Sequence, residues 1–334
     1  MHPLLSTALT VATAYRAYSH KSLTPLGIVA AVATSVVHSI HPFSTLTTCL
    51  LFGFYIVGTA ATKHKNAIKQ TLTVSSTGTS GEATPRTHVQ VFANSISASI
   101  LILVHYFLIY GDIKAGKEIT FSLVSGGSWK DTLIVGVMTQ YAAVCSDTLS
   151  SELGILSRSQ PRLIYNPLKA VPPGTNGGVS LAGFVSGFAG SVWIAFICVL
   201  ALPVAKEQAS SSDELFKFKA TIAGVVIAAG MLGTVLDSFL GATLQASVID
   251  VKAGKIVESE GGEKVLVAGT VRRRLAAGKS GMGATAKTKA VSDGPSGSRK
   301  VYSGVDVLSN NGVNLAMAGI VAAGGVWWGW WYTQ

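Results

Sequence analysis

The chain has 334 residues, of which 49% are hydrophobic and only 13% are charged. A soluble domain usually carries about a quarter charged residues, so this composition excludes an ordinary soluble enzyme. The formal net charge is +10. Cationic loops beside anionic lipid or a polyphosphate explain that charge as well as nucleic acid does, and we expect no nucleic-acid partner.

The apolar residues collect into about eight blocks of 16 to 30 residues. A helix needs roughly 20 predominantly apolar residues to cross a bilayer. The pattern therefore predicts an all-α, polytopic membrane protein with about eight transmembrane helices in one bundle, and a single membrane domain over residues 1–334. The predicted spans are 3–19, 25–40, 44–61, 89–110, 131–153, 178–203, 219–248 and 312–332.

Three loops are basic, and they alternate along the chain. The loop 62–88 holds four Lys and Arg against one acid, the loop after the fifth span has three and no acid, and the loop 249–311 has eleven against six. The positive-inside rule makes these loops cytoplasmic, which leaves both termini on the opposite face. Within the long loop, residues 251–273 alternate around Gly261-Gly262-Glu263. This predicts a small β-hairpin on the cytoplasmic side.

Three acids lie within or at the ends of predicted spans: Asp147, Glu152 and Asp237. A charged side chain at mid-membrane costs on the order of 3 kcal/mol, so such residues usually face a wet cavity and serve function. Protonated or paired structural acids, or acids at the water boundary, are the alternative. Helical spacing places Asp147 and Asp237 on small, polar stripes of the fifth and seventh spans. Mg²⁺ prefers oxygen ligands and phosphate partners, so we expect all three acids to be catalytic metal ligands, with nucleotide orientation as a second role for Glu152.

A Gly/Pro-rich segment, residues 171–178, precedes the sixth span. Such a loop in front of a helix N-terminus is able to bind an anion through its backbone amides, whereas the alternative is a plain turn. Basic residues just upstream favour a phosphate cradle. The predicted phosphate- and nucleotide-binding residues are Ser151, Arg158, Arg162, Lys169, Gly174, Thr175, Asn176, Gly177, Gly178, Asn310, Asn311 and Asn314.

The last three of these form a polar run before the final span, where a helix cap is the alternative. Polar side chains on the fourth and seventh spans complete the prediction as substrate contacts. They are Gln90, Asn94, Gly241 and Gln245. Hydrogen bonds between neighbouring helices would explain the same residues without a ligand.

Several ordered motifs resemble one integral-membrane family, that of transmembrane protein 19 and plant phytyl-phosphate kinase. They are Gln90-Val-Phe-Ala-Asn94, Cys145-Ser-Asp-Thr-Leu-Ser-Ser-Glu-Leu-Gly154, Pro173-Gly-Thr-Asn-Gly-Gly-Val-Ser180, Gly233-Thr-Val-Leu-Asp-Ser-Phe-Leu-Gly-Ala-Thr-Leu-Gln245 and Asn310-Asn-Gly-Val-Asn-Leu315. The resemblance covers roughly residues 50 to 330. One departure is Ala316-Met317, which stands where the family usually has Ser-Ser, so we expect no hydroxyl role there.

The resemblance implies a membrane enzyme that phosphorylates an isoprenoid monophosphate to its diphosphate. Its wider group of prenol and dolichol kinases favours CTP, so the implied co-substrate is CTP or another nucleoside triphosphate, with Mg²⁺ as cofactor. The implied location is the endoplasmic reticulum or a related endomembrane. An ion-coupled transporter or lipid-handling protein that uses the same acids is the alternative. The spacing Gly183-x-x-x-Gly187 leaves dimerisation open.

Overall fold

The computed structural model describes residues 3–76, 85–125, 128–258, 260–262, 264–265 and 298–334. Every predicted apolar block contains a long helix. These helices are α1 (Pro3–Ser19), α2 (Pro25–Ile40), α3 (Ser44–Lys63), α5 (His88–Leu108), α7 (Thr132–Gly154), α8 (Leu181–Ala201), α9 (Ser212–Leu244) and α11 (Asn310–Tyr332). The fold class is thus the predicted helical bundle.

Five of the described helices are long and apolar enough to cross a membrane: α3, α5, α8, α9 and α11. Helices α1 and α2 are shorter, with 17 and 16 residues. Helix α7 has 23 residues but carries Gln140, Asp147 and Glu152. The membrane-protein class follows from the five helices, and the number of eight spans stays a prediction.

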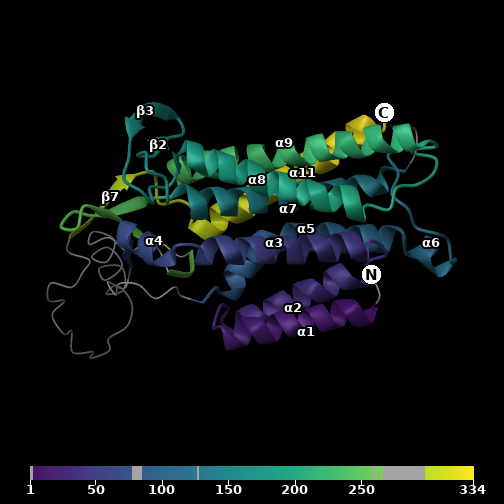
Figure 1. The fold of residues 1–334 in the computed structure, drawn as a ribbon, viewed down its shortest axis with the longest axis horizontal. Coiled ribbons are helices and arrows are strands. Elements are labelled where there is room, and N and C mark those ends of the chain that lie inside the picture. The colour runs from purple at the N-terminus through teal and green to yellow at the C-terminus, as the bar shows by residue number, and fades with distance from the viewer. Residues whose placement is uncertain (1–2, 77–84, 126–127, 259, 263, 266–297) are drawn as a thin grey trace, which may run out of the picture.

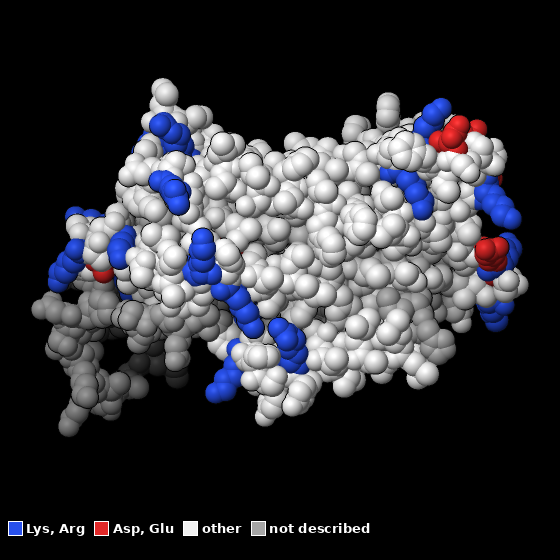
Figure 2. Space-filling model, viewed as in Figure 1, with Lys and Arg blue, Asp and Glu red and all other residues white. Residues whose placement is uncertain are grey.

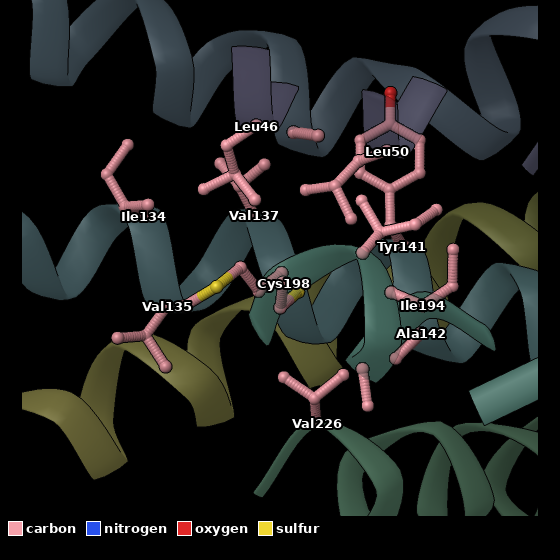
Figure 3. Packing of buried hydrophobic residues seen from close by; sticks show 14 of the residues in the cluster. Leu46, Leu50, Ile134, Val135, Val137, Tyr141, Ala142, Ile194, Cys198 and Val226 are labelled. Atoms are coloured by element: carbon pink, nitrogen blue, oxygen red, sulfur yellow. The ribbon is translucent and has the colours of Figure 1, made fainter. Parts of the chain in front are cut away.

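The long helices lie side by side, with both described chain ends at one end of the bundle and the strands at the other (Figure 1). Helix α7 is central and packs against α3, α5, α8, α9 and α11. Every residue from Thr132 to Ser146 is buried. Figure 3 shows this core, in which Tyr141 of α7 lies among apolar side chains of α3, α8 and α9. The α1–α2 pair lies at the margin of the bundle, next to α3 and α5.

Glycine allows α7 and α8 to approach closely. A Cβ atom added at Gly183 would lie 3.1 Å from Ser150 Oγ, and one added at Gly187 would lie 2.9 Å from Ser146 Oγ. Small residues at such positions let helix backbones pack against each other inside a membrane. The Gly183-x-x-x-Gly187 motif therefore packs against α7 inside the bundle, and dimerisation stays an open question.

Two small sheets cover the end of the bundle at which the predicted cytoplasmic loops lie. One has the order β1-β6-β5-β7, formed by Val74–Ser75, Lys255–Glu258, Ser247–Asp250 and Arg299–Ser303; the other has the order β3-β2-β4, formed by Asn166–Ala170, Arg162–Leu163 and Gly178–Val179. The short helices are α4 (Asn66–Leu72), α6 (Tyr110–Lys114), η1 (Trp129–Asp131) and η2 (Glu260–Gly262). The β element in the long loop is thus confirmed.

Two boundaries differ from the prediction. Helix α9 starts seven residues before position 219, because Ser211 and Glu214 form a capping box that extends the helix into charged sequence. The hairpin is formed by β5 and β6 around residues 251–254, where Gly254 has φ of +65°. Gly261 lies in η2 and is not the turn of a hairpin, because β6, the strand before it, pairs with β5 and β1. Residues 266–273 of the predicted hairpin lie outside the described residues.

Candidate functional site

A polar cavity of about 840 Å³ lies between the end of the helix bundle and the two sheets. Its lining comes from α4, the ends of α7 and α9, the loop before α8, the start of α11 and strand β6. Lys and Arg side chains are spread over this end of the molecule, whereas the opposite end mixes both signs (Figure 2). The volume lies within the usual range for small-molecule sites.

Two predicted acids meet in the lining. Asp147 of α7 and Asp237 of α9 are both half-buried, and their carboxyl groups lie within hydrogen-bonding distance of each other. The hydroxyls of Ser146 and Thr234 lie 2.7 Å apart just below them and join the same two helices. Like charges so close together are unfavourable unless a proton or a cation lies between them. The pair therefore requires such a partner.

One oxygen of this pair is unsatisfied. Asp237 Oδ1 is buried and has no hydrogen-bond partner among the described residues. Within the same part of the chain, no group of three or more His, Cys, Asp and Glu side chains could hold a metal ion. Mg²⁺ commonly binds through one or two carboxylates plus substrate phosphates and water. The residues present thus fit Mg²⁺ bound together with a phosphate ligand, and they do not fit a closed protein-only metal centre.

Glu152 lines the cavity but has a different partner from the one we expected. Its Oε2 accepts a hydrogen bond of 2.7 Å from Lys69 Nζ, and its Oε1 accepts one of 2.8 Å from Thr62. Lys69 Nζ also donates to the carbonyl oxygens of Ala61 and Thr62. All three donors of the ammonium group are thereby used. Glu152 and Lys69 therefore fasten α4 to α3 and α7, and Glu152 does not join the aspartates in one metal-ligand set.

The loop before α8 lines the cavity as predicted, but most of its amides are already used. The amide of Thr175 donates to Pro172, that of Asn176 to Ser247 Oγ, and that of Gly178 to the Thr175 carbonyl. Gly177 has φ of +71°, and a Cβ atom there would collide with α9 at Ala242. The loop is thus a rigid wall docked on α9 beside Asp237. A phosphate cradle stays a prediction for the amides of Gly174 and Gly177.

The three upstream cations do not line the cavity. Arg158, Arg162 and Lys169 are exposed, and Lys169 lies over the ring of Tyr302. In the described chain, the cations of the lining are instead Lys69, Arg86, Lys255 and Lys264. In the sequence, Lys69 and Arg86 count only as loop charges, because nothing local indicates that their loop folds back onto α7.

Arg86 is the cation with the most unused donors. Its Nη2 donates to Thr62 Oγ1 at 2.6 Å, and this is its one side-chain partner among the described residues. A guanidinium group has five N–H donors, which suit phosphate geometry. By contrast, Lys264 already donates to two carbonyl oxygens and pairs with Asp306. Arg86 is thus the residue best able to take a phosphate group.

The lining holds five acids against four cations within the described residues. One of the acids is Glu258 on β6, where the loss of solvent raises the pKa of the carboxyl group and the negative charge of Glu152 acts in the same direction. Asp147 and Asp237 would repel a polyphosphate when both are ionised. A divalent cation bound with the polyphosphate removes that repulsion, which agrees with the unsatisfied oxygen of Asp237.

Two long helices begin at the cavity. Ser180 caps α8 by accepting from the Gly183 amide, and Ser309 caps α11 by accepting from the Gly312 amide. Ser180, Gly183, Ser309 and Asn310 all line the cavity. Helix N-termini carry partial positive charge and favour phosphate groups. The cavity therefore combines two anion-attracting helix ends with an acidic pair.

The remaining predicted residues divide into two groups. Ser151, Gln90, Gly241 and Gln245 line the cavity together with Asn310. Asn311, Asn314 and Asn94 are not part of its lining. The Asn311 side chain donates to the carbonyl of Gly261, and the Asn94 side chain donates to the carbonyl of Gln90 on the same helix. The backbone carbonyl of Asn94 accepts from Gln140 of α7, which is the kind of contact between helices given as the alternative. The cap of α11 is Ser309 and not Asn311.

Comparison with known proteins identifies the family of the chain. Residues 8–322 match the family described as integral membrane protein DUF92. The chain belongs to this family. It is 30% identical to Protein PGR of Arabidopsis thaliana over 302 residues, which are 90% of this chain and 87% of that protein. This similarity confirms the resemblance to the phytyl-phosphate kinase family.

A second relative is an uncharacterised membrane protein of Methanocaldococcus jannaschii. It is 32% identical over 123 residues, which are 36% of this chain and 43% of that protein. No solved structure matches the chain.

Proposed function

We propose that the protein is a membrane-embedded lipid kinase. It transfers the γ-phosphate of a nucleotide, CTP in the first instance, to an isoprenoid monophosphate such as phytyl phosphate, and the product is the diphosphate. Its site is the polar cavity, in an endoplasmic-reticulum or related endomembrane, with the basic loops on the cytoplasmic side. The relation to Protein PGR supports an enzyme of this family.

The observation that carries the proposal is the pairing of Asp147 and Asp237 in the lining of a cavity at which α8 and α11 begin. Carboxylates attract a divalent cation, and helix N-termini attract phosphate. Phosphoryl transfer requires both within one site, because charge on the transferred group must be neutralised while the reacting oxygens are aligned. Binding of a neutral ligand requires neither a pair of carboxylates nor helix N-termini.

In this proposal Asp147 and Asp237 hold Mg²⁺. When bound, Mg²⁺ would supply positive charge that offsets the charge of the nucleotide phosphates and the negative charge that develops on the transferred group. Arg86 binds the phosphate of the lipid through the N–H groups that have no partner among the described residues. Glu152 and Lys69 act as positioning residues that hold α4 against the bundle. The loop at Gly174 to Gly178 closes the cavity on the side of α9.

The reaction needs little general-base help. A phosphate monoester loses its second proton with a pKa near 6, so the nucleophile is already ionised at pH 7. An oxygen of the lipid phosphate forms the new bond to the γ-phosphorus while the bond to the β–γ bridging oxygen breaks. The nucleoside diphosphate leaves with the electron pair. The protein contributes alignment, charge neutralisation and exclusion of water, which would otherwise accept the phosphoryl group.

The packing of α7 favours a kinase over a transporter. Transport through the bundle requires access to the acids from both faces. Between Asp147 and the other end of α7, every residue from Thr132 to Ser146 is buried in the helix core. The cavity approaches the acids from the side of the sheets. Access to the acids from the side of the sheets suits an enzyme.

A direct transfer assay tests the proposal. Detergent-purified protein is incubated with nucleotide labelled at the γ-phosphate and a panel of prenyl monophosphates and free prenols, with Mg²⁺ or with a chelator. We expect labelled prenyl diphosphate that requires Mg²⁺ and forms fastest with CTP. Folded protein that gives no product with any acceptor and any nucleotide would contradict the proposal.

A further inference from the structure

A second cavity, of about 240 Å³, lies between the α1–α2 pair and helices α3 and α5. We name it the α1–α5 groove. Its interior is lined largely by apolar and small side chains from all four helices. Among them are Ala14, Ile28, Ala31, Val32, Leu51 and Phe54. The hydroxyls of Thr10 and Ser35, which also line it, lie 2.6 Å apart and join α1 to α2.

The groove meets the polar cavity at one place. Thr62, Arg86 and Gln90 line both spaces. These residues lie where α3 ends and α5 begins, at the end of the bundle that carries the sheets. The apolar groove is therefore adjacent to the cavity in which we place phosphate chemistry.

The mouth of the groove is cationic. Lys21, Lys63 and Arg86 belong to its lining, and no Asp or Glu among the described residues does. Lys21 has φ of +49°, a left-handed conformation that usually favours glycine. The positive charge of Lys21 thus lies at the turn between α1 and α2, although this backbone conformation is unfavourable for lysine. A hydrocarbon space that ends in three cations is complementary to an amphipathic anion.

The backbone fixes the wall of the groove to Arg86. The Thr24 amide donates to the carbonyl of Arg86 at 2.9 Å, and the Arg86 amide donates to the carbonyl of Ser22 at 3.0 Å. Gly27 lies against the same carbonyl, where a Cβ atom would be 2.8 Å away. The start of α2 and the backbone of Arg86 are therefore fixed relative to each other, and the guanidinium group is held by Thr62. A chain in the groove would end at a defined distance from Arg86.

We propose that the α1–α5 groove binds the hydrocarbon tail of an anionic isoprenoid lipid, whose phosphate head lies at Arg86 and faces the polar cavity. This inference rests on the proposed function, because it places the lipid substrate of that reaction. Helices α1 and α2 then form a substrate-binding wall that selects tail length, although they lie outside the α7–α9 core that carries the aspartates.

A matched pair of substitutions on α2 tests the groove. Ala31→Phe fills it, because Ala31 belongs to the lining, whereas Ala33→Phe adds the same ring at an exposed position outside the lining. We measure kcat/KM for a twenty-carbon and a five-carbon prenyl monophosphate. The ratio of long-chain to short-chain kcat/KM is expected to fall about tenfold or more in A31F and to stay constant in A33F. An equal loss for both substrates, or an unchanged ratio, would overturn the proposal.

A photolabelling arm separates the groove from the kinase reaction. A prenyl monophosphate with a diazirine in its tail is irradiated with the full-length protein, and the modified peptides are mapped by mass spectrometry. Adducts on lining residues of α1, α2, α3 or α5 support the groove even where no phosphoryl transfer is found, in which case the proposed function alone fails. Adducts elsewhere overturn the groove. Equal competition by phosphatidic acid would identify an ordinary membrane phospholipid as the occupant and would also overturn it.

Discussion

The contact between α7 and α9 next to the aspartates is open to a precise test at Gly233. A Cβ atom at Gly233 would lie 2.9 Å from the Cα atom of Ala143. The Cβ atom of Ala143 is nearer still, at 2.5 Å. Ordinary van der Waals contact begins near 3.4 Å, and neither atom of Ala143 moves without the backbone of α7, so the helices must separate by about 0.9 Å. Gly233 is one helical turn before Asp237. The substitution Gly233→Ala therefore moves Asp237 away from Asp147.

Gly224 on the same helix is the matched control, since no atom lies within 4 Å of a Cβ atom built there. Both substitutions gain the same helix propensity, about 1 kcal/mol in water. Overpacking typically costs 1–3 kcal/mol. The free energy of unfolding of G233A is thus expected to lie about 1–3 kcal/mol below that of G224A. A displacement of catalytic groups by ~1 Å is able to cost 10²-fold in rate, so we expect a loss of ten- to a hundredfold for a shift of this size.

The assays are SDS-driven unfolding in mixed micelles and the initial rate of phosphoryl transfer. G224A is expected to match the wild type in rate and to equal or exceed it in stability. If G233A matches G224A in both assays, the close packing of α7 and α9 does not position the aspartates, and the reasoning is refuted.

Two further predictions concern Glu152, which we expected to bind metal, and Arg86, which the sequence shows only as a loop charge. Glu152→Gln leaves the ammonium of Lys69, which is 9% exposed, without its counter-charge, so the free energy of unfolding should fall by about 2 kcal/mol. The Mg²⁺ concentration for half-maximal rate should stay the same, and a shift in that concentration would return Glu152 to the metal site. Arg86→Gln should raise KM for the lipid phosphate about tenfold, as expected for the loss of a hydrogen bond to a charged group, whereas the exposed Arg162→Gln should leave KM unchanged. Equal effects of the two Arg substitutions would remove Arg86 from the phosphate site.

Much of the fold follows from the sequence, because the cost of burying charge in a bilayer is strong and local. The long apolar blocks became helices, and the small, polar stripes around Asp147 and Asp237 do face each other. Helical periodicity alone is enough to place both acids on glycine-bearing faces. The close approach of helices that such faces allow then brings the carboxyl groups together.

The predictions that were wrong depend on contacts between residues far apart in the sequence. Lys69 reaches Glu152 across 83 residues, and β6 pairs with β1 and β5 rather than with the sequence that follows Gly261. Nothing near Arg162 in sequence shows that it lies on an exposed strand. Basic residues near a Gly-rich loop predicted a phosphate site at this end of the bundle. Which cations line the cavity there depends on the tertiary fold.

The central claim is that Asp147 and Asp237 are the acids on which metal-dependent phosphoryl transfer depends. The most direct test is the initial rate of prenyl diphosphate formation by D147N and D237N, with D213N as control, since Asp213 is an exposed acid at the other end of α9. The account predicts that each of the first two loses about 10³-fold or more in rate while remaining folded, and that D213N keeps the wild-type rate. A near-normal rate in either D147N or D237N would contradict it.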